Sequence, residues 1–377
     1  MRLCIDLTAG FQNPAGIGRY AIELAIALVN LQSGEEISFF YNDPKGRIPR
    51  PPLDLFPRKV IRCPKKIWTL SMLMGTLTRI GMDELFGNAD VYHATDHMLP
   101  NCRKTKTVIT LHDTTFAVCP QTHTRLLRWS SNLMVPIFLK ACHRVIADSN
   151  NTKKDAMRLY GIDPGKITVV YPGVTDGFRQ VGAVEKKDLK VRYRLPDRFF
   201  LYVGTIEPRK NLTLLLDSYR NLINRGATFS LVIAGKKGWM YESFFRKLSD
   251  LDLEDKVVLP GFVPDDDLPT LYSAALGFLF PSLYEGFGFP VLEAMACGTP
   301  VICSNTSSLP EVAGDAALLL PPEDVQAWVE AIERVSRDDL LRADLSRRGQ
   351  LQASRFRWEN TARQTLQVYR EVCEGSA

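Results

Sequence analysis

The segment from Glu285 to Glu293 reads EGFGFPVLE and places two carboxylates on either side of a glycine-rich loop. Glycine allows the backbone to come close to a ligand. Pro290 suits the first turn of a helix, where its missing N–H is no loss. A helix N-terminus is a natural anion site, because its first amides lack partners within the helix. The backbone amides that we expect to face a diphosphate belong to Gly286, Phe287, Gly288 and Phe289.

The two glutamates can serve different parts of a sugar nucleotide. We expect Glu293 in the first turn of the helix, where its carboxylate can accept hydrogen bonds from a ribose diol. Glu285 precedes the loop, where it can meet sugar hydroxyls. The alternative is two solvated glutamates around a tight turn. The apolar run 275–280 before the segment favours the first interpretation, because a strand, a glycine-rich loop and a short helix form a ligand site at the carboxyl end of a parallel sheet.

A second turn, Gly204 to Asn211 (GTIEPRKN), lies between an apolar strand and a helical run. Its Arg209 and Lys210 stand at a helix start, where cations are unfavourable for the helix dipole. Their placement is explained if an anion binds there, since Arg and Lys both bind phosphate oxygens. The alternative is an ordinary pair of surface cations.

Three further groups follow expected strands. Gly16 and Gly18 lie in the segment 13–20 after the first strand, but no complete G-x-G-x-x-G is present, which disfavours a nicotinamide site. His112 ends the strand 107–111 and is expected at the carboxyl edge of a sheet, although a structural role is equally compatible with its spacing. Gly235 follows the strand 229–234 and is expected near the base or the diphosphate. His93 is a second candidate, for the acceptor.

Thirteen strand-like runs alternate with helical stretches, a pattern typical of parallel sheets covered on both faces. The series runs twice, and the boundary is expected near residue 180. The expected strands are 3–6, 37–41, 60–63, 91–93, 107–111, 144–147, 167–171, 199–204, 229–234, 257–259, 276–280, 301–303 and 317–320.

The E-x7-E element in this setting resembles the retaining glycosyltransferases of family 4, and the resemblance covers almost the whole chain. It implies an α/β protein of GT-B fold, with two Rossmann-like parallel-sheet domains that face each other across a cleft. Residues 1–180 would bind the acceptor, residues 181–355 would bind the nucleotide-sugar, and a helix in residues 356–377 would pack back toward the first domain.

The resemblance also implies an activity: metal-independent transfer of a hexose from a nucleotide-sugar, with retention of anomeric configuration, to a glycan or a polyprenyl-linked acceptor. The EPRKN version resembles a bacterial mannosyltransferase branch of surface polysaccharide synthesis, which favours GDP-mannose as donor. Thr205 departs from the family pattern, in which an arginine often stands at this position, and Arg209 is expected to supply that charge. The residues expected to act in catalysis are Glu285, Arg209, Lys210 and His112.

Other functions stay open: a UDP-sugar-dependent transferase, a GT-B nucleotide-sugar epimerase, or a nucleotide-sugar or glycan binding protein without catalysis. A dehydrogenase is a more distant alternative. No cofactor beyond the donor substrate is expected and no metal is required, because cations stabilise the leaving diphosphate.

The bulk properties agree with a two-domain protein of 377 residues and net charge +5. No apolar run reaches the roughly 18 residues of a membrane span. The eight cysteines form no C-x-x-C pair, which is typical of reduced thiols in a cytosolic protein. A basic stretch, 45–66, precedes the apolar segment 67–77. This combination suits contact with the anionic inner face of a membrane, or equally a solvated loop and a core helix. Nucleic acid explains the charge less well.

Overall fold

The structure, a computed structural model, describes residues 1–12 and 16–375, except for the side chain of Leu127. The chain divides into two compact units. The first unit consists of Met1–Ala117, Arg125–Gly173 and Arg357–Ala377, and the second unit of Val118–Thr124 and Val174–Phe356. The chain therefore passes from the first unit to the second at Gly173, and returns at Arg357. The short segment Val118–Thr124 belongs to the second unit, which the sequence pattern did not indicate.

The first unit contains a seven-stranded sheet in the order β3-β2-β1-β4-β5-β6-β7, and all neighbouring strands are parallel. Its strands are β1 (Arg2–Asp6), β2 (Glu36–Asn42), β3 (Arg58–Ile61), β4 (Val91–Ala94), β5 (Lys106–Leu111), β6 (Arg144–Ala147) and β7 (Ile167–Val169). Its helices are α1 (Thr8–Gln12), α2 (Ile17–Asn30), α3 (Lys65–Thr78), α4 (Thr115–Val118), α5 (Arg125–Ala141), α6 (Asn150–Tyr160) and α15 (Trp358–Glu374).

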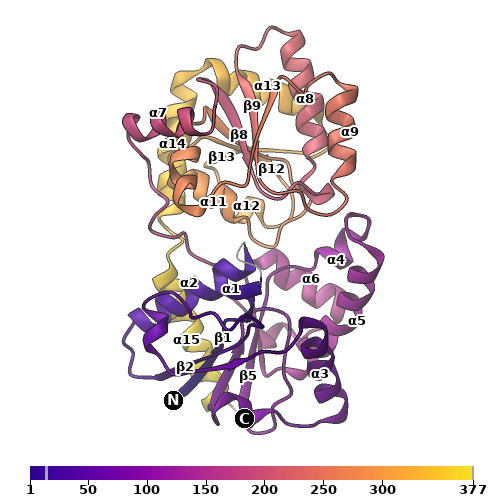
Figure 1. Ribbon diagram of the computed structural model, residues 1–377, viewed down its shortest axis with the longest axis vertical. Coiled ribbons are helices and arrows are strands. Elements are labelled where there is room, and N and C mark those ends of the chain that lie inside the picture. The colour runs from indigo at the N-terminus through magenta and orange to yellow at the C-terminus, as the bar shows by residue number, and fades with distance from the viewer. Residues whose placement is uncertain (13–15, 376–377) are drawn as a thin grey trace. The chain divides into compact units, whose positions relative to one another are not determined.

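Apolar side chains from both faces of this sheet build its core, as expected for parallel strands covered by helices. Helix α15, the yellow end of the chain in Figure 1, packs on α2 and on the sheet. Helix α6 shows how the local sequence sets an element: Ser149 caps its start by accepting a hydrogen bond from the Thr152 amide, and Gly161 ends it with φ of 63°. Serine is a common residue at the start of a helix, because its hydroxyl can accept from an amide of the first turn.

The second unit contains a six-stranded parallel sheet in the order β10-β9-β8-β11-β12-β13. Its strands are β8 (Phe199–Val203), β9 (Ser230–Ala234), β10 (Val257–Gly261), β11 (Gly277–Phe280), β12 (Val301–Ser304) and β13 (Ala317–Leu320). Its helices are α7 (Ala183–Arg192), α8 (Leu212–Asn224), α9 (Glu242–Asp250), α10 (Leu268–Ala274), α11 (Phe289–Ala296), α12 (Leu309–Ala313), α13 (Val325–Arg337) and α14 (Asp339–Ala353). Strand β11 pairs with β8, so segments far apart in the sequence meet at one edge of the sheet.

The α/β architecture with two parallel sheets is confirmed, and each expected strand is present with shifts at its ends. Strand β3 is displaced at both ends, from the expected 60–63 to Arg58–Ile61. The reason is its pairing with β2, in which Phe39 to Asn42 lie opposite Arg58 to Ile61. In the part of the chain that the structure describes, no helix is long and apolar enough to cross a membrane.

Candidate functional site

Two glycines bring the loops after β8 and β9 into direct contact in the second unit. Gly204 and Gly235 follow these neighbouring strands, with φ of 152° and 156°. A Cβ atom on Gly235 would lie 1.9 Å from the carbonyl oxygen of Gly204. Glycine is therefore required at 235 by both conformation and space. This contact places Gly235 at the carboxyl edge of the sheet. Its expected position near the base or the diphosphate stays a prediction.

Four charged side chains form a nearly buried network at this edge. The Lys210 ammonium lies 2.6 Å from one carboxylate oxygen of Glu285, and the Arg209 guanidinium lies 2.7 Å from the other. Arg209 also pairs with Glu207 at 2.8 Å, and it donates to the carbonyl oxygen of Tyr284 at 2.7 Å. The turn after β8 and the loop after β11 are thus connected by one carboxylate that holds two cations.

The charges in this network control one another. Burial alone would raise the pKa of Glu285, but Arg209 and Lys210 outweigh it and lower the pKa to about 2. Burial and the neighbouring Arg209 lower the pKa of Lys210. Glu285 is therefore a permanent anion, which makes it a poor general base at neutral pH. Its two oxygens both contact cations, and the expected contacts with sugar hydroxyls stay a prediction.

Two serines hold the loop that follows Glu285. The Glu285 amide donates to Ser307 Oγ at 2.8 Å, and Ser308 Oγ donates to the carbonyl oxygens of Glu285 and Phe287 at 3.0 and 2.6 Å. Sequence reasoning missed both serines, although they follow β12 at the same edge of the sheet. Gly288 is the residue before α11 and has φ of 122°, so the amides of the first turn of α11 begin at this loop.

Glu293 lies just beyond the first turn of its helix, whereas the sequence placed it within that turn. Helix α11 starts at Phe289, so Glu293 is its fifth residue, and no acidic residue is in the first turn. The expectation of a first-turn position was wrong, because the helix begins before Pro290. Glu293 is buried and its carboxylate accepts a hydrogen bond from the Tyr272 hydroxyl at 3.0 Å. Tyr272, on α10, fixes this carboxylate and was not singled out by the sequence.

Two aromatic side chains near Gly235 differ in their surroundings. The Trp239 Nε1–H donates to the carbonyl oxygen of Thr122 at 2.6 Å, and its ring stacks on His123. Phe262 is 56% exposed, and the Lys236 ammonium lies 4.0 Å from the centre of its ring. Of the two, Phe262 offers the more accessible ring face, because Trp239 packs on the segment Val118–Thr124.

His112 directly follows β5 in the first unit and pairs with Asp148, which directly follows the neighbouring strand β6. Its Nδ1 lies 2.6 Å from the Asp148 carboxylate, and its Nε2 lies 2.8 Å from the carbonyl oxygen of Thr95. Both partners can accept a hydrogen bond from the ring, which favours the imidazolium at neutral pH. Burial alone would lower the pKa of His112, but Asp148 outweighs it and raises the pKa to about 8. The sequence did not identify Asp148 as the partner.

The other first-unit candidates are separate from this pair. His93 is buried between the Tyr369 hydroxyl of α15 at 2.6 Å and the Thr110 hydroxyl at 2.8 Å, which gives it a packing role rather than contact with an acceptor. Gly16 precedes α2 with φ of 47°, and Gly18 is buried in its first turn. Residues 13–15 of the predicted glycine segment lie outside the described residues.

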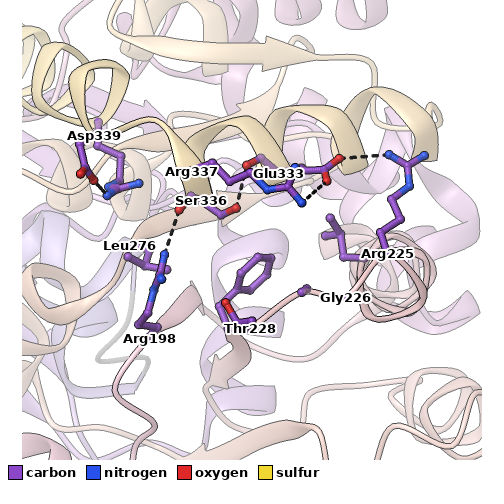
Figure 2. A pocket seen from close by; sticks show the side chains of 13 residues that line it. Arg198, Arg225, Gly226, Thr228, Leu276, Glu333, Ser336, Arg337 and Asp339 are labelled. Atoms are coloured by element: carbon purple, nitrogen blue, oxygen red, sulfur yellow. Dashed lines mark hydrogen bonds and ion pairs between the residues drawn. The ribbon is translucent and has the colours of Figure 1, made fainter.

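A cavity of about 420 Å³ lies at the opposite, amino end of the second unit's sheet, beside Thr228 and Leu276. Figure 2 shows Glu333 between Arg225 and Arg337, with ion-pair distances of 3.2 and 2.8 Å. These contacts connect the end of α8 to α13. The cavity is therefore remote from the charged network of Glu285. Among residues 1–12 and 16–375, no group of three or more His, Cys, Asp or Glu side chains could hold a metal ion.

Comparison with known proteins gives matches over both halves of the chain. Residues 14–177 match glycosyltransferase family 4, and residues 185–352 match the glycosyl transferases group 1. O-antigen chain mannosyltransferase B of Escherichia coli is 31% identical, with 94% of this chain and 96% of the relative covered. O-antigen chain mannosyltransferase RfbU of Salmonella typhimurium is 30% identical over 66% of each chain.

Solved structures agree at the level of the fold. Sucrose-phosphate synthase from Thermosynechococcus elongatus superposes with a TM-score of 0.80 at 22% identity and covers 100% of both chains. WaaG, a glycosyltransferase involved in lipopolysaccharide biosynthesis, has a TM-score of 0.74 at 14% identity, with 97% of this chain and 99% of WaaG covered. Since the two domain matches and a relative of full length agree, the chain belongs to the glycosyltransferases of family 4, with the GT-B fold.

Proposed function

We propose that this glycosyltransferase moves mannose from GDP-mannose, with retention of configuration, to a glycan or a polyprenyl-linked acceptor in surface polysaccharide synthesis. The observation that carries the donor assignment is the network of Glu285, Arg209 and Lys210, which sets two cations beside the start of α11. The mannose assignment rests on the relatives, two of which are named O-antigen mannosyltransferases.

The cations have a direct role in this proposal. Lys210 has three donors, and its contact with Glu285 uses one of them. Arg209 is fixed by Glu207 and Glu285, so its charge is preorganised rather than mobile. Charge that develops on a leaving diphosphate would meet this fixed field, and one preorganised donor contributes roughly 3 kcal/mol. A divalent metal is then not required for the leaving group.

The remaining site residues are assigned by the same reasoning. Glu293, fixed by Tyr272, would hold the ribose diol. The amides at the start of α11 would bind phosphate oxygens. Because both ring nitrogens of His112 are engaged within the protein, His112 would act on the donor sugar through its charge. Gly16 and Gly18 would approach the acceptor. With both oxygens of Glu285 paired, a donor phosphate oxygen is the group proposed to take the acceptor's proton, which fits retention without a carboxylate nucleophile.

Calorimetric titration with GDP-, UDP- and ADP-sugars, with EDTA present, tests the donor. We expect GDP-mannose to bind and Glu293→Gln to weaken its binding by roughly 10- to 100-fold, because hydrogen bonds to charged groups contribute about 1.5–3 kcal/mol. The exposed Glu323→Gln is the matched control. If only UDP-mannose bound tightly, the donor would be UDP-mannose instead of GDP-mannose. If no nucleotide-sugar bound, the assignment of the donor site would be refuted.

Turnover separates transfer from the other functions. NMR of the product should show the anomeric configuration of the donor on a polyprenyl-linked glycan. Glu285→Gln should abolish turnover and lower the free energy of unfolding by about 3 kcal/mol, because it leaves a buried cation without its partner. Epimerised donor without a new glycosidic bond would point to a nucleotide-sugar epimerase. Donor binding without turnover would point to a binding protein without catalysis.

A further inference from the structure

Helix α3 in the first unit carries apolar side chains on two faces. One face packs into the core through the buried Trp68 and Met72. The other face is exposed and has the spacing of a single helical stripe. This exposed stripe consists of Ile67, Leu70, Met74 and Leu77. A helix that only covers a sheet would be polar on its outer face, so the exposed stripe of α3 needs another partner.

Helix α5 repeats this arrangement and packs beside α3. Its inner face contributes Val135, Phe138 and Leu139 to the core. Its outer face exposes Leu126, Trp129 and Leu133, and Trp129 is 68% exposed. The neighbouring positions of α3 and α5 can be followed in Figure 1. We call the exposed stripes of the two helices together the α3/α5 face.

The charged residues of the two segments that contain α3 and α5 have one sign. Residues 55–82 and 125–147, which contain both helices, include no Asp or Glu. The cations of these two segments are Arg58, Lys59, Arg62, Lys65, Lys66, Arg79, Arg125, Arg128, Lys140 and Arg144. An apolar face with cations around it is complementary to the interface of an anionic bilayer.

Two other occupants fit less well. A second copy of the chain would place one cationic face against another, and like charges repel. A transmembrane arrangement fails on length, because α3 has 14 residues and α5 has 17, whereas a span needs about 20. Two short helices with exposed apolar stripes can instead lie in the plane of the interface.

We propose that the α3/α5 face binds an anionic lipid bilayer, with Leu70, Leu126 and Trp129 entering the boundary between headgroups and acyl chains. Lys65 and Lys66 at the start of α3 then contact lipid phosphates. This surface adds α5 to the basic and apolar segments of residues 45–77. It deepens the proposed use of a polyprenyl-linked acceptor, but its geometry does not depend on the donor chemistry.

Intrinsic fluorescence of the full chain tests this directly. Trp68, Trp328 and Trp358 are buried, so Trp129 should report most strongly on lipid. Vesicles of phosphatidylcholine with phosphatidylglycerol should shift the emission to shorter wavelength, and vesicles of phosphatidylcholine alone should do so much less. The shift should disappear in Trp129→Phe. An unchanged spectrum with anionic vesicles would refute the proposal.

Vesicle sedimentation measures the two contributions separately. The double variant Leu70→Ser with Trp129→Ser should bind anionic vesicles at least tenfold more weakly, because it removes apolar area from the inserted surface. Its matched control is Leu340→Ser with Leu351→Ser, which changes exposed residues of α14 in the second unit and should bind normally.

The electrostatic contribution has its own variant. Lys65→Gln with Lys66→Gln should weaken binding about 25-fold, since each cation at an anionic surface contributes about 1 kcal/mol. High salt should reduce this difference, and the exposed Lys187→Gln is the control.

Two results would contradict the bilayer assignment. One is equal binding to neutral and anionic vesicles. The other is self-association in solution that Trp129→Ser abolishes, which would make the α3/α5 face a contact between copies. Donor titration of each variant separates this proposal from the catalytic one: unchanged donor affinity with lost vesicle binding supports the face, whereas lost donor affinity would place these residues in the donor site and overturn it.

Discussion

The pair of His112 and Asp148 makes the stability of the first unit depend on pH. Both groups are buried, and the imidazolium is held by Asp148 on one nitrogen and by the carbonyl oxygen of Thr95 on the other. Tyr20 packs edge-on against the ring, and Asp113 adds a further negative charge nearby. A buried cation is tolerated here because each of its donors meets an acceptor.

We expect His112 to contribute stability that is fully present below about pH 6.5, its unfolded pKa, and that is lost as pH rises through about 8. The difference of about 1.5 units corresponds to about 2 kcal/mol. Urea unfolding of wild type and His112→Gln between about pH 6 and 9 measures this contribution. The difference in free energy of unfolding between the two proteins should become smaller as pH rises.

His143→Gln is the control for this titration. Burial lowers the pKa of His143, so above about pH 7.5 this side chain is neutral in both the folded and the unfolded state. The difference in free energy of unfolding between wild type and His143→Gln should therefore stay constant from about pH 7.5 to 9. If the difference in free energy of unfolding between wild type and His112→Gln also did not change with pH, His112 would be neutral in the folded protein.

At the scale of elements, close loop contacts decide where the charged network forms. The loop after β9 touches the loop after β8 at Gly235 and Gly204, and the Ile206 amide donates to the carbonyl oxygen of Lys236 at 2.9 Å. This contact supports the turn that carries Arg209 and Lys210. A change at Gly235 therefore acts on the site through the backbone.

Gly235→Ala should lower the free energy of unfolding by about 3 kcal/mol or more and weaken donor binding. Its Cβ would meet backbone that cannot move aside, and a non-glycine residue is strained at φ of 156°. Gly226→Ala is the matched control, because Gly226 has φ of 80° but no atom within 4 Å of an added Cβ. Chemical unfolding compares the two, and equal losses would show that the clash is relieved by movement.

The sequence could predict elements better than their pairing. Periodicity and turn residues indicated the strands and the loops at 204–211 and 285–293. The contact of Glu285 with Arg209 and Lys210 was not predictable as a pair, since it depends on β11 lying beside β8 rather than beside β10. The contact of Asp148 with His112 depends in the same way on β5 lying beside β6.

Side-chain exposure was the other property that the sequence left open. The segment 67–77 was compatible with a core helix or with a membrane surface. In the structure, α3 is a core helix on one face and exposed on the other. A pattern with apolar residues on both faces does not tell which of them the sheet covers, and α5 has the same ambiguity.

At the scale of the whole molecule, α15 completes the first unit from the far end of the sequence. The Tyr369 hydroxyl bonds to His93 at the end of β4, and Thr361 donates to the carbonyl oxygen of Tyr171 at 2.8 Å. Trp358 packs edge-on against Tyr20 of α2. The sheet of the first unit thus depends on this helix for part of its cover.

Tyr369→Ala should destabilise the first unit by about 3 kcal/mol, because it leaves a large cavity and removes a hydrogen bond from buried His93. Hydrogen exchange should accelerate in β1, β4 and α2, while β8 and β9 keep their protection. Gln367→Ala, on the exposed side of α15, is the control. Faster exchange in both units alike would show that they unfold as one cooperative body.

The position of α15 also bears on how the chain folds during its synthesis. Domains made first usually fold first, but here β1 to β7 emerge before the second unit and α15 emerges after it. The sheet of the first unit therefore lacks part of its cover until the second unit has been translated. During this time the surface beneath Trp358, Leu366 and Tyr369 is uncovered. A chain truncated after residue 356 would therefore have all of the second unit but an incomplete first unit, and chaperones should bind the uncovered surface of the first unit.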